Sequence, residues 1–127
     1  MNNKMLEESV KYINELDNVS FVELLRHLEN KGFNVRGECA ILLNENLVVW
    51  VGMSQEFINI FQELRNRCPI IACNKIIYLM DGASLPIKPI NAKSIKNNYK
   101  YKSERWIPVV FRKKQDINKK NALFVYN

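Results

Sequence analysis

Cationic and aromatic side chains gather in the last third of the chain, and together they could bind a polyanion. Residues 88–127 contain 11 Lys and Arg against 2 Asp and Glu, a net charge of +9, whereas residues 1–87 contain 8 against 11, a net charge of −3. Lys and Arg can neutralise phosphates, and aromatic rings can stack on bases. The residues expected at such a contact are Lys88, Lys93, Lys96, Tyr99, Lys100, Tyr101, Lys102, Arg105, Trp106, Arg112, Lys113 and Lys114.

This charge distribution predicts a protein that binds nucleic acid without catalysing a reaction, with DNA favoured over RNA. A local positive field attracts polyanions and raises their rate of encounter, so the affinity should fall steeply as salt is added. The same features also fit a protein-interaction module, such as an inhibitor or adaptor of a larger nucleic-acid enzyme. Its basic segment would enter an acidic groove, and residues 122–126 would add a strand to a partner's sheet.

Residue types that carry out catalysis are present, but they do not follow the patterns that catalysis needs. His27 is the only histidine, and it has no cysteine pair at the spacing of a usual zinc site. Ser54 lacks the second glycine of a nucleophile elbow, and its place suits a helix N-cap. The carboxylates Glu38, Glu45 and Asp81 do not form the spaced acidic motif of a nuclease. We expect no catalytic residue, no metal site and no cofactor.

The bulk composition predicts one domain with a hydrophobic core. The chain has 127 residues, of which 47% are apolar. Its longest apolar runs, such as Leu47–Val51, are too short to cross a bilayer, and the N-terminal residues lack the apolar segment of a secretory signal. Three cysteines, an odd number, argue against a disulfide framework. We therefore expect a cytoplasmic protein with no membrane partner, and the heavy use of Asn, Lys and Ile fits a bacterial gene, carried by a phage or mobile element.

Apolar patterns with a period of 3.6 residues predict helices in the first half of the chain. The first helix is expected over Lys4–Leu16. Ser20 and Glu23 form a capping box, which predicts a second helix that ends at Gly32. Another apolar stripe, preceded by a serine and followed by a proline, predicts a helix over Gln55–Arg67.

Shorter apolar runs predict strands. Cys39–Leu43 and Leu47–Val51 flank a three-residue polar loop and indicate a hairpin. The second of these runs has no polar alternation, which is typical of a strand in the middle of a sheet. Further strands are predicted at Pro69–Ala72, Lys75–Met80, Ala83–Ile87 (after a turn at Asp81-Gly82) and Arg105–Arg112 (interrupted by Pro108).

Together these elements predict an α+β fold. Two or three helices would pack on a small, mostly antiparallel sheet, with a basic C-terminal arm. Residues 1–87 would form the compact core, and residues 88–127 would form the arm, packed on the same single domain.

The order helix, hairpin, helix, hairpin between Val19 and Ile90 resembles a small winged-helix DNA-binding domain, with Lys75–Ile87 in the place of the β-wing. The resemblance is architectural and covers somewhat over half of the chain. It implies DNA contact through the wing and the basic arm, because the helix at Gln55–Arg67 is neutral to acidic over most of its length. Such contact suits the phosphate backbone or a single strand better than base-specific operator recognition.

Overall fold

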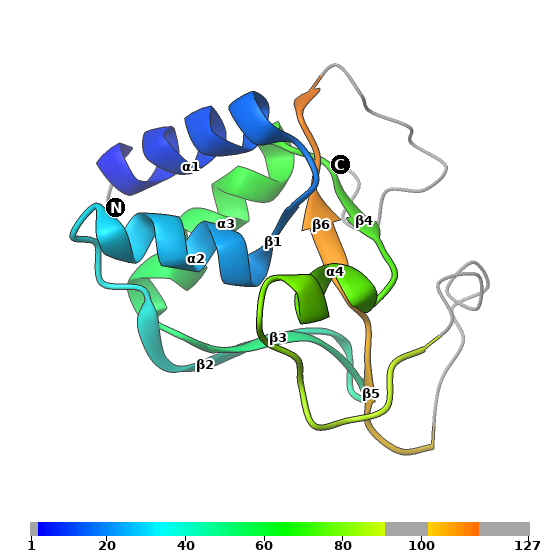
Figure 1. Cartoon of the computed structure of the whole chain (residues 1–127). Helices are drawn as coiled ribbons and strands as arrows, with labels where there is room; N and C mark the ends of the chain where they lie inside the picture. The colour runs from blue at the N-terminus through cyan, green and yellow to red at the C-terminus, as the bar shows by residue number, and fades with distance from the viewer. Residues whose placement is uncertain (1–2, 91–101, 115–127) are drawn as a thin grey trace.

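One continuous segment near the C-terminal end joins the two sheets of this protein. The computed structural model describes residues 3–90 and 102–114 (Figure 1). Within them, sheet A has the strand order β1 (Val19–Ser20), β6 (Val109–Phe111), β4 (Ile70–Ala72), and sheet B has the order β2 (Arg36–Asn44), β3 (Leu47–Met53), β5 (Arg105–Trp106). Because β5 and β6 are separated by only two residues, a single segment supplies a strand to each sheet. With four helices among the described residues, the predicted α+β fold class is confirmed.

The first helix, α1 (Asn3–Leu16), packs against the second, α2 (Phe21–Asn30), and against α3 (Gln55–Arg67). A tight bend joins α1 to β1. In this bend Asp17 and Asn18 adopt positive φ angles of 59° and 52°, a conformation that Asp and Asn tolerate better than most residues. The three helices predicted from apolar periodicity are confirmed, and Figure 1 shows them together on one side of the molecule.

Local capping signals set both ends of α2. The Oγ of Ser20 accepts the backbone N–H of Glu23 at 3.1 Å, as the capping box predicts. At the other end, the N–H groups of Gly32 and of the residue after it bond to two carbonyls in the last turn, which is a Schellman motif. Gly32 has a φ of 91°, a conformation in which a residue with a Cβ is strained.

The predicted hairpin is formed by β2 and β3, which pair antiparallel. Asn44 pairs with Leu47, so the loop contains two residues, Glu45 and Asn46, one fewer than the sequence suggested. The side chain of Asn44 accepts the N–H of Asn46 at 3.1 Å and closes the turn. β3 lies in the middle of sheet B, as its unbroken apolar run predicts.

A serine cap begins α3 as expected. The Oγ of Ser54 accepts the N–H of Phe57 at 3.0 Å and donates to the carbonyl of Asn34 at 2.8 Å. Ser54 therefore fixes the start of α3 to the segment that leads into the hairpin. The apolar stripe of the helix is buried, and its residues are Phe57, Ile60, Phe61 and Leu64.

The strand β6 is the central strand of sheet A and is antiparallel to both neighbours. Val109, Val110 and Phe111 are all buried. The predicted C-terminal β segment is therefore present, and its break at Pro108 is the point where the chain passes from sheet B to sheet A. Because these apolar residues lie within the core, part of the expected arm belongs to the compact fold.

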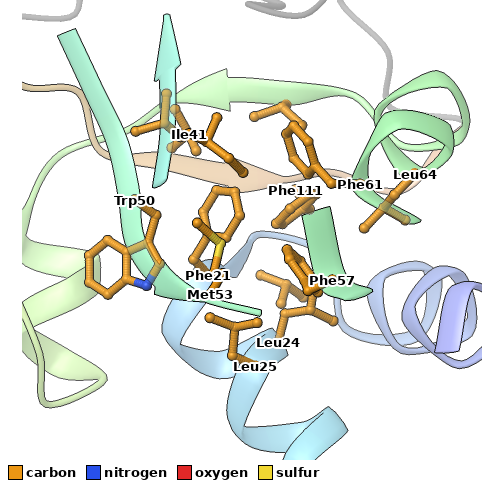
Figure 2. Packing of buried hydrophobic residues seen from close by; sticks show 14 of the residues in the cluster. Phe21, Leu24, Leu25, Ile41, Trp50, Met53, Phe57, Phe61, Leu64 and Phe111 are labelled. Atoms are coloured by element: carbon orange, nitrogen blue, oxygen red, sulfur yellow. The ribbon is translucent and has the colours of Figure 1, made fainter. Parts of the chain in front are cut away.

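Aromatic rings fill the centre of the core in two groups. In the first, Phe21 lies 4.9 Å from Phe111 and 6.3 Å from Phe57 between ring centroids (Figure 2). In the second, the ring of Tyr78 lies 5.1 Å from Trp50 and 5.2 Å from Trp106. Edge-to-face and tilted contacts of this kind add about 0.5–1.5 kcal/mol per pair to the burial of the rings. The second group joins sheet B to the helix α4 described next.

The ribbon predicted over residues 75–87 is wrong. Residues Ile76–Met80 form a short helix, α4, and residues 83–87 form no strand. Asp81-Gly82 does not make a hairpin turn, because Asp81 has a φ of −83° and Gly82, at φ 88°, terminates the helix. The structure therefore has no wing at the place that the winged-helix resemblance assigns to one.

A buried tyrosine explains why this segment is a helix. Tyr78 is 0% exposed, and its hydroxyl donates to the carbonyl of Val109 at 2.6 Å and accepts the N–H of Phe21 at 3.1 Å. A Schellman motif at Gly82 closes the helix at its C-terminal end. These contacts outweigh the β propensity of Ile76, Ile77 and Tyr78.

No helix in residues 3–90 or 102–114 is long and apolar enough to cross a membrane.

Candidate nucleic-acid interface

The structure describes seven of the twelve residues that the sequence places at a nucleic-acid contact. They fall into two groups at the ends of the segment that contains β5 and β6. The β5 group consists of Lys88, Lys102, Arg105 and Trp106, and the β6 group consists of Arg112, Lys113 and Lys114. Lys93, Lys96, Tyr99, Lys100 and Tyr101 lie outside the described residues, as do Lys119 and Lys120.

Backbone hydrogen bonds bring the members of the β5 group together although Lys88 and Arg105 are 17 positions apart in the sequence. Pro89 forms a parallel bridge with Trp106, whose N–H donates to the carbonyl of Lys88 at 2.9 Å. The Lys88 and Lys102 side chains are exposed, and Arg105 is partly exposed. The exposed carboxylate of Glu104 reduces the net charge of this group to +2.

Trp106 does not face solvent. Its side chain is 1% exposed and packs against Trp50 and Tyr78, so a base cannot reach it in this structure. The expectation that Trp106 stacks on bases is therefore wrong for this structure. Its indole Nε1 is buried and has no hydrogen-bond partner among the described residues.

The β6 group is attached to the end of α1. The guanidinium of Arg112 donates to both carboxylate oxygens of Asp17, at 2.9 and 3.3 Å, and the Lys113 N–H donates to the same carboxylate at 3.0 Å. The N–H of Lys114 donates to the side chain of Asn14 at 3.2 Å. Arg112 thus has a structural partner, whereas the exposed Lys114 side chain remains available to a ligand.

The two groups are at opposite ends of a buried strand segment. Arg105 and Lys113 are eight residues apart, a distance of roughly 25 Å if the chain is extended. Figure 1 shows β5 at the bottom of the molecule and the chain that leaves β6 next to the end of α1. Acidic side chains such as Glu7, Glu15 and Glu63 lie on α1 and α3.

Sequence reasoning missed the exposed apolar side chains of α4 because it assigned them to a strand. Ile76 is 55% exposed, Leu79 is 53% exposed and Met80 is 80% exposed. The helix could have been recognised from two signals. Asn74 accepts the N–H of Ile76 through its side chain at 3.0 Å, as a residue before a helix often does, and Gly82 lies just after the last turn.

Titratable side chains gather between α1 and α2. Tyr12 stacks on His27 with ring centroids 3.8 Å apart, and its hydroxyl donates to Glu23 at 3.0 Å. Burial and this hydrogen bond raise the pKa of Tyr12 to about 12. The hydrogen bond with His27, at 2.6 Å, lowers the pKa of Glu8 below its usual range. Each contact joins one helix to another, so this cluster stabilises the fold.

Asp81 and the cysteines also have structural surroundings. The carboxylate of Asp81 accepts the hydroxyl of Ser20 at 2.6 Å and so connects α4 to the cap of α2. Burial raises the pKa of Cys68 to about 11 and that of Cys73 to about 12, which makes both thiols poor nucleophiles at neutral pH. Within the described residues, no three His, Cys, Asp or Glu side chains are grouped so that they could hold a metal ion.

Comparison with known proteins does not assign this chain to a family. No protein-family model matches the chain, and neither a curated protein nor a solved structure matches it. The exposed cations and apolar side chains described above are thus the basis on which a function can be proposed.

Proposed function

We propose that this protein binds nucleic acid through exposed cations at the two ends of residues 105–113, with DNA favoured over RNA and without catalysis. The observation that carries the proposal is the placement of Lys88, Lys102 and Lys114 on the surface at these two ends. The ion pairs formed among the described residues do not involve these three lysines. They belong to the part of the sequence with a net charge of +9.

The arrangement suits the capture of a phosphate backbone. Phosphates follow one another about every 3.4 Å along one strand of B-form DNA, so a separation of up to roughly 25 Å corresponds to at most about seven phosphates. The strands β5 and β6 hold the backbone of both groups at a fixed separation. A polyanion of that length could contact both groups at once, which raises the affinity above that of either group alone.

The proposal is tested by fluorescence anisotropy with labelled single-stranded and duplex DNA over a series of salt concentrations. Full-length protein is compared with the variants K88Q/K102Q and K114Q, and with K4Q/K31Q as a control. Lys4 and Lys31 are also exposed, but they lie on α1 and at the end of α2. K4Q/K31Q removes as much charge as K88Q/K102Q, so the comparison separates a local contact from a general effect of net charge.

We expect K88Q/K102Q to reduce the slope of log K against log salt by about 1–2, because each lost phosphate contact removes roughly 0.7–0.9. K114Q should reduce it by about half as much, and K4Q/K31Q should change it little. A salt-independent affinity, or an equal effect of K88Q/K102Q and K4Q/K31Q, would contradict the proposal. Deletion of residues 88–127 is unsuitable, because it would remove β5 and β6 from the core.

The alternative is a protein-interaction module that acts on a larger nucleic-acid enzyme. Residues 122–126, which would add a strand to the partner's sheet, lie outside the described residues. A nucleic-acid binder purifies with absorbing nucleic acid that high salt removes, whereas a module of this kind purifies without it and binds one protein. A cytoplasmic location and a phage or mobile-element origin stay predictions from the sequence.

A further inference from the structure

Three of the five residues of α4 expose large apolar side chains. Ile76, Leu79 and Met80 are each more than half exposed, and we refer to them together as the α4 patch. Single exposed apolar residues are common on protein surfaces, but three within one and a half helical turns form a contiguous surface of a kind that often binds a ligand. Of the other two residues of α4, Ile77 is partly buried and Tyr78 is fully buried.

The α4 patch lies between the two basic groups. The hydroxyl of Tyr78 donates to the carbonyl of Val109, which is four residues from Arg105 and four from Lys113. The N–H of Cys73, just before α4, donates to the carbonyl of Pro108 at 2.9 Å. These contacts hold α4 over the middle of the β5–β6 segment, as Figure 1 also shows. A chain bound at both basic groups would pass close to α4.

We propose that the α4 patch contacts the bases of a single-stranded nucleic acid whose phosphates bind the two basic groups. This inference rests on the proposed function and names the form of nucleic acid that the site takes. In a duplex the faces of the bases are stacked on one another, whereas a single strand can turn them toward the protein. Leu, Ile and Met side chains pack on base faces where these are unstacked, and the flexible Met80 can adapt to different bases.

Charges next to the patch favour an anionic partner over a neutral or basic one. Lys75, at the start of α4, is exposed, and the Arg26 guanidinium reaches the end of the helix, where it donates to the carbonyl of Asp81 at 2.9 Å. The Asp81 carboxylate accepts the hydroxyl of Ser20 and so faces the cap of α2. The patch therefore has cations beside it as well as at both ends of the segment beneath it.

The test compares L79S/M80S with a matched control, L42S. Leu42 is 51% exposed, close to the 53% of Leu79, but lies on β2, which β3 separates from β5. The probes are a labelled thymidine oligonucleotide of about twelve residues and a duplex of the same length, within the range of single-strand site sizes. Because these side chains are exposed, neither variant should lose stability toward urea; M80S alone serves if the double variant does not fold.

We expect L79S/M80S to bind the single strand about tenfold more weakly, which corresponds to one base contact. Its slope of log K against log salt should stay that of the wild type, since no phosphate contact is lost. L42S should bind like the wild type, and the duplex affinity should not change with L79S/M80S.

The inference is overturned if L79S/M80S binds the single strand like the wild type, or if single-strand and duplex affinities fall equally. In either case an effect of K88Q/K102Q on the salt slope would leave the proposed function intact. If the wild type binds neither probe at low salt, the proposed function fails and the inference fails with it. An unchanged single-strand affinity in L79S/M80S would direct attention to a protein partner for the patch.

Discussion

The carboxylate of Asp17 and the guanidinium of Arg112 form a two-bond ion pair between residues 95 positions apart in the sequence. Both side chains are largely buried, at 18% and 24% exposure. The same carboxylate accepts the N–H of Lys113, so it fixes the point at which the chain leaves β6. The Asp17 backbone has a φ of 59°, a conformation that costs most residues with a Cβ about 1–2 kcal/mol.

Replacement of Asp17 should therefore lower the free energy of unfolding. D17N keeps a residue that tolerates positive φ but removes the charge, and we expect a loss of about 1–2 kcal/mol because the Arg112 guanidinium loses its charged hydrogen bonds to this carboxylate. D17A should lose about 1 kcal/mol more, since alanine is strained at positive φ. Urea unfolding of the three proteins measures both steps.

The exposed ion pair between Arg36 and Glu29 provides the control for this prediction. Their side chains are 70% and 42% exposed, so solvent screens the attraction. E29Q should leave the urea midpoint almost unchanged. Equal effects of D17N and E29Q would show that the Asp17–Arg112 pair contributes no more than a surface contact.

Y78F should destabilise the fold strongly although it removes a single oxygen. The hydroxyl of Tyr78 bonds to the carbonyl of Val109 and to the N–H of Phe21, and both groups would be left buried without a partner. We expect a loss of about 2–3 kcal/mol in the free energy of unfolding, measured by urea titration. Y12F removes one partly buried hydrogen bond and should cost less; a reversed order would contradict the role given to Tyr78.

The raised pKa of Tyr12 predicts a loss of stability at high pH. The unfolded chain releases the phenol proton near pH 10, whereas burial and the bond to Glu23 hold the folded-state pKa at about 12. Between these values the unfolded state binds fewer protons than the folded state, so stability falls as the pH rises from about 10 to about 12. Urea midpoints across this range should fall more steeply for the wild type than for Y12F. Parallel curves would show that Tyr12 does not contribute.

G37A should disturb the junction between the hairpin and α3. A Cβ on Gly37 would lie 2.8 Å from the carbonyl oxygen of Met53 and 2.9 Å from the Cα of Ser54, both of them backbone atoms. We expect a loss of about 1–3 kcal/mol, as for other substitutions that overfill a packed site. G52A serves as the comparison: its Cβ meets no atom within 4 Å, but its φ of 78° strains alanine, so its loss of about 1–2 kcal/mol measures backbone strain alone. A normal stability of G37A would show that the two segments can move apart freely.

Much of the fold could be predicted because its signals are local. The serines at positions 20 and 54 and the glycine at position 32 mark helix ends through bonds to residues three or four positions away. The hairpin followed from two apolar runs and a polar loop. The helix α4 could not be predicted from its apolar run, because the contacts that hold Tyr78 come from residues 57 and 31 positions away.

The candidate site was predictable only in part, because the burial of its residues depends on contacts between distant segments. The net charge of residues 88–127 can be read directly from the sequence. Lys88, Lys102 and Lys114, which contribute to this charge, are exposed in the structure. Burial of Trp106 depends on its partners Trp50 and Tyr78, which belong to distant segments. The exposure of the α4 patch depends on tertiary contacts in the same way. The contacts of Tyr78 bury one side of α4 and leave the patch on the other side.

The central place of β6 has a consequence for how the chain folds during synthesis. Both neighbours of β6 in sheet A leave the ribosome before it, β1 at residues 19–20 and β4 at residues 70–72. Until residue 111 has emerged, neither strand has its partner, and Phe21 lacks its contact with Phe111. Nascent chains that expose unpaired strands and apolar rings aggregate readily. We therefore expect the nascent chain to complete this fold only after residue 111 has left the ribosome.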